Sequence, residues 1–235
     1  EKEIKKLEML QKISQKYDDF KVPKILLSNK NEKQLLFYEL EFISGENFDS
    51  SSEKLNSEKI KFFSKKLGRI IETFSNESIN SKINEKEFLK QKFGEMIGAV
   101  NKIKLSTNLG KELFKECTQN IYELEINKTD LNNKSTFCHG DFALDNVLIT
   151  KKYEICLIDP LHNDYENIMW DYAKILQSSM TYWNLIKYQN FQLIANNKKI
   201  FITPNEHITM FHRHFLKNLE PDNISTITLY LAATL

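Results

Sequence analysis

The sequence predicts an α+β protein in which a small strand-containing part precedes a larger, mainly helical part. Residues 35–43 place Tyr38, Leu40 and Phe42 on one face of a strand and two glutamates on the other. From residue 57 onward, apolar residues recur at three- and four-residue spacing, which is typical of amphipathic helices. We expect the small part to cover residues 1–45 and the larger part residues 46–235.

The small part is expected to contain one helix and two strands. The helix covers residues 1–17, and its apolar stripe is formed by Ile4, Leu7, Leu10, Ile13 and Tyr17. Pro23 closes the turn after it, and a short strand is expected over residues 22–27. Gly45 is expected to end the second strand. The polar residues 49–54 are expected to form a loop at the hinge between the two parts.

The larger part is expected to be helical except for two hairpins. Ser57 is the expected N-cap of its first helix. Further helices are expected over residues 84–103, 109–125, 168–180, 205–219 and from 222 onward. One hairpin, residues 191–194 and 199–203, turns at Asn196-Asn197. The other joins residues 147–150 to 153–158 through a two-residue turn, which sets Thr150 opposite Tyr153 and Asn146 opposite Leu157.

Reactive side chains cluster around this second hairpin. His139-Gly140-Asp141 is followed after four residues by Asn146, and Asp159 comes just past the same end of the hairpin as Asn146. This is the H-x-D-x-x-x-x-N…D arrangement in which kinases place one catalytic carboxylate and two metal ligands. We expect Asp141 to accept the proton of an attacking hydroxyl, and Asn146 and Asp159 to hold Mg²⁺, which prefers oxygen ligands. His139 is expected to support the loop by hydrogen bonding to its backbone.

Composition excludes several other classes of protein. Lys and Arg number 33 against 32 Asp and Glu, so the net charge of +1 indicates no nucleic-acid or anionic membrane partner. No apolar run approaches the roughly 20 residues that span a bilayer, and no secretory signal opens the chain. Cys117, Cys138 and Cys156 fit no zinc spacing, so we expect reduced, mostly buried thiols and a cytoplasmic protein.

The residues around the motif resemble the aminoglycoside phosphotransferase and choline kinase family, the small-molecule branch of the protein-kinase-like fold. His139-Gly-Asp141, Asn146 and Ile-Asp159-Pro are similar to the family's catalytic loop and second metal ligand. Trp170-Asp171-Tyr-Ala-Lys174 is similar to the helix whose aspartate, here Asp171, braces that loop. The resemblance implies a two-lobed kinase-like fold, with the N-terminal lobe only partly present in this chain, and Mg²⁺ and ATP as cofactors.

The resemblance also implies a nucleotide site. Residues 36–45 resemble the hinge strand that reads adenine, so Glu41 and Ile43 would offer a carbonyl and an N–H to the base. Glu3 is similar to the helix glutamate that pairs with the ATP-binding lysine, with Glu8 as a rival. No glycine-rich phosphate loop and no strand lysine precede Glu1, and the chain stops at Leu235 within an apolar run, so we expect residues missing at both ends. The alternative is a catalytically silent, pseudokinase-like module that binds a nucleotide or another ligand.

The acceptor is expected to be a small molecule. Only eleven residues separate Asp159 from Asp171, and no Ala-Pro-Glu follows, so the peptide platform of protein kinases has no room. The run from Asp159 to Ser178 also looks like phosphotransferases encoded with bacterial surface-polysaccharide genes. A sugar or amino alcohol is therefore the favoured substrate.

Overall fold

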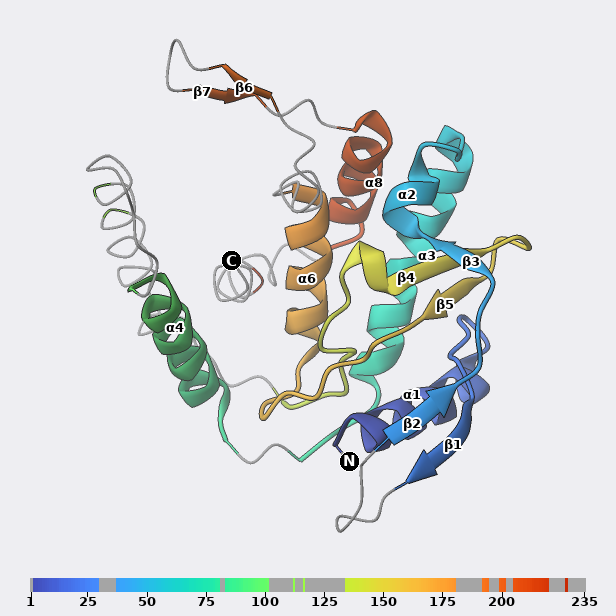
Figure 1. Ribbon diagram of the computed structural model, residues 1–235, viewed down its shortest axis with the longest axis vertical. Helices are drawn as coiled ribbons and strands as arrows, with labels where there is room; N and C mark the ends of the chain where they lie inside the picture. The colour runs from blue at the N-terminus through green and yellow to red at the C-terminus, as the bar shows by residue number, and fades with distance from the viewer. Residues whose placement is uncertain are drawn as a thin grey trace.

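The computed structural model describes residues 2–29, 37–80, 83–101, 134–180, 192–194, 199–201 and 205–219, together with residues 112, 116 and 227 (Figure 1). Helices and strands are mixed within these ranges, so the predicted α+β class is confirmed. The boundary between residues 45 and 46 stays a prediction. The helices predicted at 109–125 and from 222 onward lie outside the described ranges, apart from isolated residues.

Helix α1 (Lys2–Tyr17) buries the predicted apolar stripe, since Ile4, Leu7, Leu10 and Ile13 are all buried. The strand predicted over 22–27 begins later, as β1 (Ile25–Asn29), and pairs antiparallel with β2 (Phe37–Leu40). The residues before Ile25 do not join β1, because the backbone of Lys21 is hydrogen-bonded to residues 155–157 instead. The Lys21 N–H donates to the Ile155 carbonyl at 2.8 Å and its own carbonyl accepts from Leu157 at 2.9 Å.

Two predictions between residues 45 and 54 are wrong. Gly45 does not end a strand but begins β3 (Gly45–Asn47), which pairs with β4 (Val147–Thr150). A Cβ on Gly45 would lie 3.0 Å from the Ile149 carbonyl oxygen, so the glycine permits this close approach. Residues 48–52 form helix α2 (Phe48–Ser52) rather than a loop, because the Asn47 side chain caps it and Phe48 is fully buried.

The hairpin of β4 and β5 (Ile155–Leu157) is present, but its predicted register is wrong by one residue. Val147 lies opposite Leu157, and Thr150 donates its N–H to the Glu154 carbonyl at 3.0 Å. The loop therefore has a third residue, Tyr153, whose φ of 60° is left-handed. A three-residue loop that ends in one left-handed residue is a common hairpin connection, whereas a two-residue turn needs residues such as glycine or asparagine rather than lysine.

Most of the remaining described residues of the larger part lie in helices. These helices are α3 (Ser57–Ser75), α4 (Glu85–Asn101), α6 (Ile168–Met180) and α8 (Glu206–Leu216). The N-cap of α3 is Asn56 rather than Ser57, because the Asn56 side chain accepts the Lys59 N–H at 2.9 Å. The second predicted hairpin is present as β6 (Gln192–Ile194) and β7 (Lys199–Phe201), and its turn lies outside the described residues.

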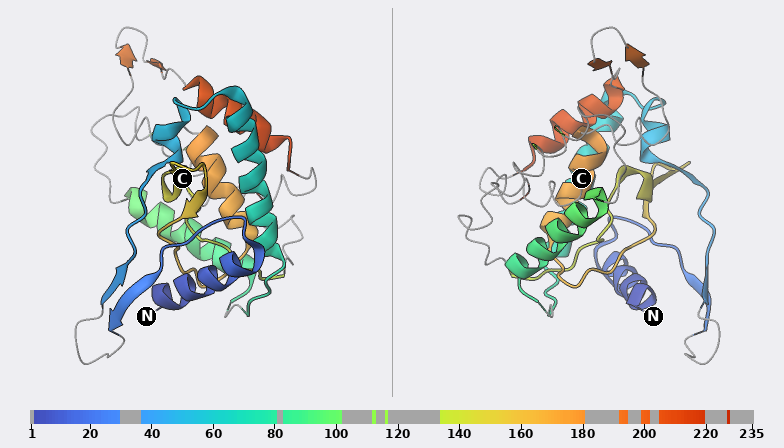
Figure 2. Two further views of the ribbon diagram at one scale, coloured as in Figure 1. Left: turned by 90° about the vertical axis from the view of Figure 1, so that its right-hand side faces the viewer. Right: turned by 60° about the vertical axis from the view of Figure 1, so that its left-hand side comes forward.

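One hydrophobic core joins α1 to the helical part. Figure 2 shows α3, α6 and α8 packed side by side, and aromatic rings fill the space between them and their neighbours. Phe48 meets Phe211 at 4.8 Å between ring centroids, and Phe74 meets Phe137 at 5.1 Å. Because Phe137 precedes His139 by two residues, the core anchors the segment that carries the predicted site. No helix among the described residues is long and apolar enough to cross a membrane.

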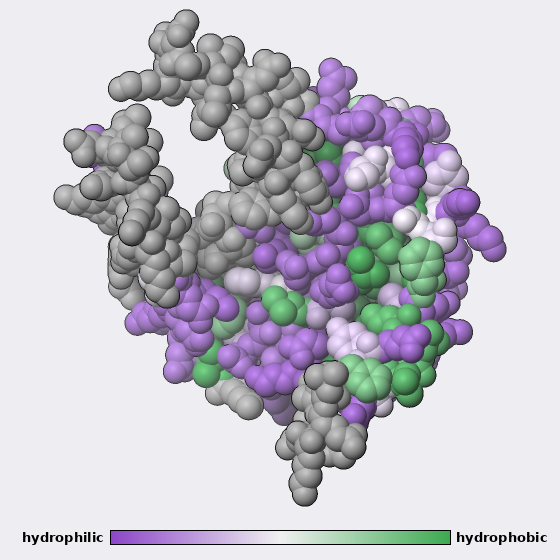
Figure 3. Space-filling model, viewed as in Figure 1, coloured by the Kyte–Doolittle hydropathy of each residue, from purple (hydrophilic) through white to green (hydrophobic). Residues whose placement is uncertain are grey.

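Apolar side chains also lie on the surface of the β1–β2 hairpin. Leu26 is 60% exposed, and Leu27, Phe37 and Tyr38 are also exposed. Phe42, just after β2, is 89% exposed. Figure 3 shows hydrophobic residues gathered on this side of the molecule. The hairpin therefore contributes little to the core that supports the site.

Candidate active site

The segment 137–146 is fixed to the core by buried apolar side chains, and its polar residues lie between them in the sequence. Phe137, Phe142 and Leu144 are fully buried. The one-turn helix η1 (Leu144–Asn146) then leads directly into β4. Since these apolar side chains fix the backbone on both sides, the side chains of Asp141 and Asn146 are positioned by the core rather than by their own contacts alone.

Asp141 and Asn146 are in direct contact. The Asn146 Nδ2 donates to the Asp141 Oδ2 at 2.9 Å and to the Asp141 carbonyl at 2.8 Å. Both contacts use the amide nitrogen, which leaves the Asn146 Oδ1 as an oxygen donor for a cation. Asp141 itself is half-buried, with 35% of its side chain exposed, so its carboxylate is accessible to a ligand.

Asp159 follows β5 at the end of the hairpin where Asn146 lies. The Ile158 N–H donates to the Asn146 carbonyl at 3.1 Å, so the residue before Asp159 is paired with Asn146 directly. Asp159 has a left-handed φ of 53° and is exposed. No cluster of three or more His, Cys, Asp or Glu ligands occurs in the described part of the chain. The site instead offers hard oxygen donors from an amide and a carboxylate, which fit Mg²⁺ completed by substrate phosphates and water.

Asp171, near the start of α6, is hydrogen-bonded to the backbone of the loop. Its carboxylate accepts the His139 N–H at 2.6 Å and the Gly140 N–H at 2.8 Å, and the side chain is completely buried. Burial raises the pKa of Asp171 to about 7, although the two N–H bonds act in the opposite direction. The carboxylate therefore satisfies two backbone donors that would otherwise be buried without a partner.

His139 is buried as predicted, and its hydrogen bond to the loop backbone stays a prediction. Neither ring nitrogen has a hydrogen-bond partner among the described residues, and the ring stacks on Phe142 at 5.4 Å between centroids. Burial, assisted by the Lys6 charge, lowers the pKa of His139 to about 3. The backbone of Ile158 and Asp141 is close enough to oppose that shift without reaching hydrogen-bond geometry. The imidazole is neutral at physiological pH and fills space under the loop.

Gly140 is required by two independent features of its position. Its φ is +85°, and a Cβ would lie 2.0 Å from the Leu161 carbonyl oxygen. Leu161 in turn donates its N–H to the His139 carbonyl at 2.9 Å, so the segment after Asp159 packs directly on the loop. The glycine therefore lets the two parts of the site approach each other.

We expect Gly140→Ala to destabilise the protein by about 3 kcal/mol and to reduce any activity of the site, because the backbone must move away from Leu161. Thermal unfolding measures the first effect. Gly68→Ala is the matched control, since nothing lies within 4 Å of a Cβ at Gly68 in the middle of α3. That control is expected to be neutral or slightly stabilising. Equal unfolding temperatures for Gly140→Ala and the wild type would contradict this interpretation.

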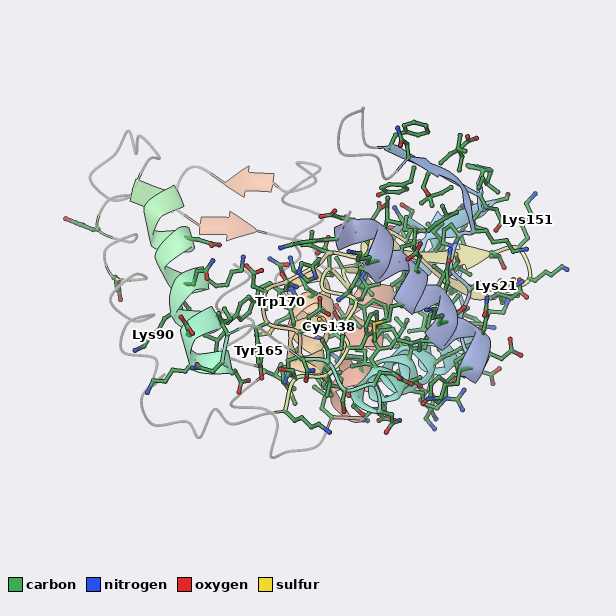
Figure 4. The ribbon with its side chains drawn as sticks, turned by 90° about the horizontal axis from the view of Figure 1, so that it is seen from below. Lys21, Lys90, Cys138, Lys151, Tyr165 and Trp170 are labelled. Atoms are coloured by element: carbon green, nitrogen blue, oxygen red, sulfur yellow. The ribbon has the colours of Figure 1, made fainter. Side chains whose placement is uncertain are left out.

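Sequence reasoning missed most of the contacts that α6 makes with the loop. The Trp170 Nε1 donates to the Gly140 carbonyl, and Trp170 lies near the centre of the molecule (Figure 4). The Lys174 ammonium lies 3.2 Å from the Asp141 Oδ1, and the Ser178 hydroxyl accepts the Leu144 N–H at 3.2 Å. The three-to-four-residue spacing of these side chains was the available signal, because it puts them on one face of the helix.

A buried ion pair was also missed. The Lys6 ammonium of α1 pairs with the Glu166 carboxylate, and both side chains are almost completely buried. Lys6 also lies over the Phe137 ring at 4.5 Å from its centroid, and Glu166 accepts the Asn163 N–H. The pair links α1 to the segment between Asp159 and α6. Removing either partner alone would leave an uncompensated buried charge.

The structure describes the residues that are predicted to hold the nucleotide, and their roles stay predictions. Glu41 and Ile43 lie in the connection between β2 and β3. The Glu41 N–H is already bonded to the Lys24 carbonyl at 2.8 Å, which leaves the Glu41 carbonyl for a base. Glu3 is exposed on the first turn of α1, and Glu8 is half-buried on the same helix.

A family model described as APH, the phosphotransferase enzyme family, matches residues 4–192. This chain belongs to that family. A search of curated proteins gives no match.

Several solved structures of APH enzymes share the fold. The gentamicin complex of APH(2″)-IIa is 15% identical with a TM-score of 0.54, over 90% of this chain and 65% of that one. The GDP and kanamycin complex of APH(2″)-IIIa is 12% identical with a TM-score of 0.60, over 99% and 73%. AMP-bound spectinomycin phosphotransferase, APH(9)-Ia, is 14% identical with a TM-score of 0.56, over 100% and 71%.

These likenesses confirm the predicted kinase-like fold, and at such low identity they show the fold alone. This chain spans 65% of APH(2″)-IIa in the gentamicin complex and 57% in a streptomycin–ATP complex. The chain thus combines membership of the APH family with a direct contact between Asp141 and Asn146.

Proposed function

We propose that this APH-family protein transfers the γ-phosphoryl group of ATP to a hydroxyl of a small molecule. The observation that carries the proposal is the arrangement around Asp141. Its carboxylate is accessible, is oriented by Asn146 and sits on a loop braced by Asp171. That arrangement suits a base that positions an attacking hydroxyl.

In the proposed reaction, the acceptor oxygen forms a bond to the γ-phosphorus while the bond to the β–γ bridging oxygen breaks. Asp141 takes the hydroxyl proton, and ADP leaves. The Asn146 Oδ1 and the Asp159 carboxylate would hold Mg²⁺, which supplies positive charge to the phosphate oxygens. Asp171 and His139 act on the loop rather than on the substrate, the first by hydrogen bonding and the second by packing.

The nucleotide is proposed to bind beside the connection between β2 and β3. The Glu41 carbonyl and the Ile43 N–H would contact the base, as the resemblance implies, and Glu3 would pair with a lysine. Known structures of the fold in complexes with ATP, AMP and GDP support a nucleotide as the donor. The buried free thiols Cys138 and Cys156 support a cytoplasmic location.

The acceptor is proposed to be a sugar or an amino alcohol. In the structure, residues 158–167 form a short irregular segment between β5 and α6, and it packs against the catalytic loop through Leu161. Such a segment offers no extended surface for a peptide. Family members crystallised with gentamicin, streptomycin and kanamycin support a small polyhydroxylated acceptor as a class.

A substrate panel tests the proposal. The protein is incubated with Mg²⁺ and ATP, and ADP release is followed with sugars, amino alcohols and aminoglycosides as acceptors. We expect at least one acceptor to raise ADP release well above the rate without acceptor. A protein that binds ATP in a separate titration but releases no ADP with any acceptor would support the alternative, the catalytically silent binding module.

A further inference from the structure

The α6 face that supports the catalytic loop contains one contact unlike the others. Trp170, Asp171 and Ser178 all bond to backbone groups of the loop. Lys174 instead contacts the side chain of Asp141, with its ammonium 3.2 Å from Oδ1. The helix therefore holds the path of the loop with three residues and the proposed base itself with a fourth.

Lys174 and Asn146 approach opposite oxygens of the same carboxylate. The Asn146 Nδ2 donates to Oδ2 at 2.9 Å, and the Lys174 ammonium lies against Oδ1. Two donors on two oxygens fix the plane of the carboxylate, while each oxygen keeps a second lone pair for a substrate proton. The orientation of Asp141 is therefore set from two different elements of the fold, the hairpin entry and α6.

The surroundings of Lys174 favour this role over an ordinary surface ion pair. Only 19% of its side chain is exposed, so its stem is fixed by packing and its charge is less screened than that of a surface lysine. The ammonium also lies 3.4 Å from the Gln177 Oε1 on the same helix. An ammonium has three donors, and the Asp141 and Gln177 contacts use two of them.

We infer that Lys174 is a positioning residue for Asp141 in phosphoryl transfer, an inference that rests on the function proposed above. It holds the carboxylate toward the acceptor hydroxyl and keeps a positive charge beside the group in transfer, where negative charge is spread over the phosphoryl oxygens. Lys174 keeps all its protons throughout, because the hydroxyl proton passes to Asp141.

Substitution of Lys174 tests the inference. Lys174→Met keeps the length of the stem and removes the charge, and we expect kcat to fall on the order of 100-fold while KM for ATP stays within about twofold. Lys174→Arg restores a charge that reaches Asp141 and is expected to recover at least part of the lost kcat. Lys174→Gln provides a second uncharged variant if Lys174→Met unfolds at the assay temperature.

Lys151→Met is the matched control, because Lys151 is exposed in the hairpin loop at the edge of the molecule (Figure 4). It is expected to keep wild-type kcat. A kcat of a folded uncharged variant within about threefold of wild type would overturn the inference, as would an Arg variant no better than Met. If the wild type transfers no phosphate to any acceptor, the proposed function fails instead, so the two failures are distinguishable.

Discussion

Asp141→Asn is expected to lower kcat by about 1000-fold and to leave nucleotide affinity nearly unchanged. Asparagine is close in shape to aspartate and keeps one oxygen that can accept from Asn146, but it cannot take the proton of the acceptor hydroxyl. It also loses the ion pair with Lys174. Steady-state ADP release measures kcat, and titration calorimetry with ATP measures the affinity.

Asp164→Asn is the control for this substitution. Asp164 lies in the segment after Asp159, and half of its side chain is exposed beside Lys2. Asp164→Asn removes the same charge without changing the catalytic loop, so wild-type turnover is expected. Turnover by Asp141→Asn at the wild-type rate would show that another group accepts the proton, and the mechanism proposed for Asp141 would be wrong.

Asp171→Asn is expected to change the pH dependence of stability as well as the activity. The pKa of Asp171 is about 7 in the folded protein against 3.8 for a free carboxyl, so the folded state binds more protons between these values. By linkage, the contribution of Asp171 to the free energy of unfolding is present below pH 3.8 and is lost as pH rises to 7. The loss is on the order of 4 kcal/mol, since one pKa unit corresponds to about 1.4 kcal/mol.

His139 changes the free energy of unfolding with pH in the opposite direction to Asp171. Its pKa falls from 6.5 to about 3 on folding, so the unfolded state binds more protons between these values and stability increases with pH. The substitution Asp171→Asn removes only the pH dependence that comes from Asp171. The variant is therefore expected to gain stability relative to wild type as pH rises from 4 to 7, in denaturant titrations at each pH. A difference that stays constant across this range would contradict the raised pKa of Asp171.

We also expect Asp171→Asn to lower kcat by about tenfold or more at pH 8, where the wild-type carboxylate is charged. An amide presents one acceptor and one donor to the two N–H groups of His139 and Gly140, so one of those donors loses its partner. The loop then becomes less well held under Asp141. Wild-type kcat in this variant would show that the brace is dispensable for the reaction.

The sequence could predict contacts between residues that lie close together along the chain. The contact of Asp141 with Asn146 follows from a five-residue separation, and the placement of Asp159 at the same end of the hairpin as Asn146 follows from a short hairpin. Asp171 was also predictable, but from its resemblance to a known family rather than from spacing. Even the hairpin was predicted one residue out of register, because the left-handed conformation of Tyr153 has no sequence signal as strong as glycine.

The contacts that were missed join residues far apart in the chain. Lys6 and Glu166 are separated by 160 residues, and Lys174 lies on a different element from Asp141. Nothing in the local sequence distinguishes these lysines from solvated ones, since their pairing depends on how the helices pack. Helix α2 was missed for a related reason, because the burial of Phe48 against Phe211 outweighs the polar composition of the segment.

The proposed reaction forms a phosphate ester on a small molecule. Phosphorus NMR of the protein with Mg²⁺, ATP and the panel of acceptors tests this claim most directly, because it identifies the product. We expect the γ-phosphate signal of ATP to be replaced by a phosphomonoester signal with at least one acceptor, and no such replacement with Asp141→Asn. Unchanged ATP, or inorganic phosphate alone, with every acceptor in the panel would contradict the claim.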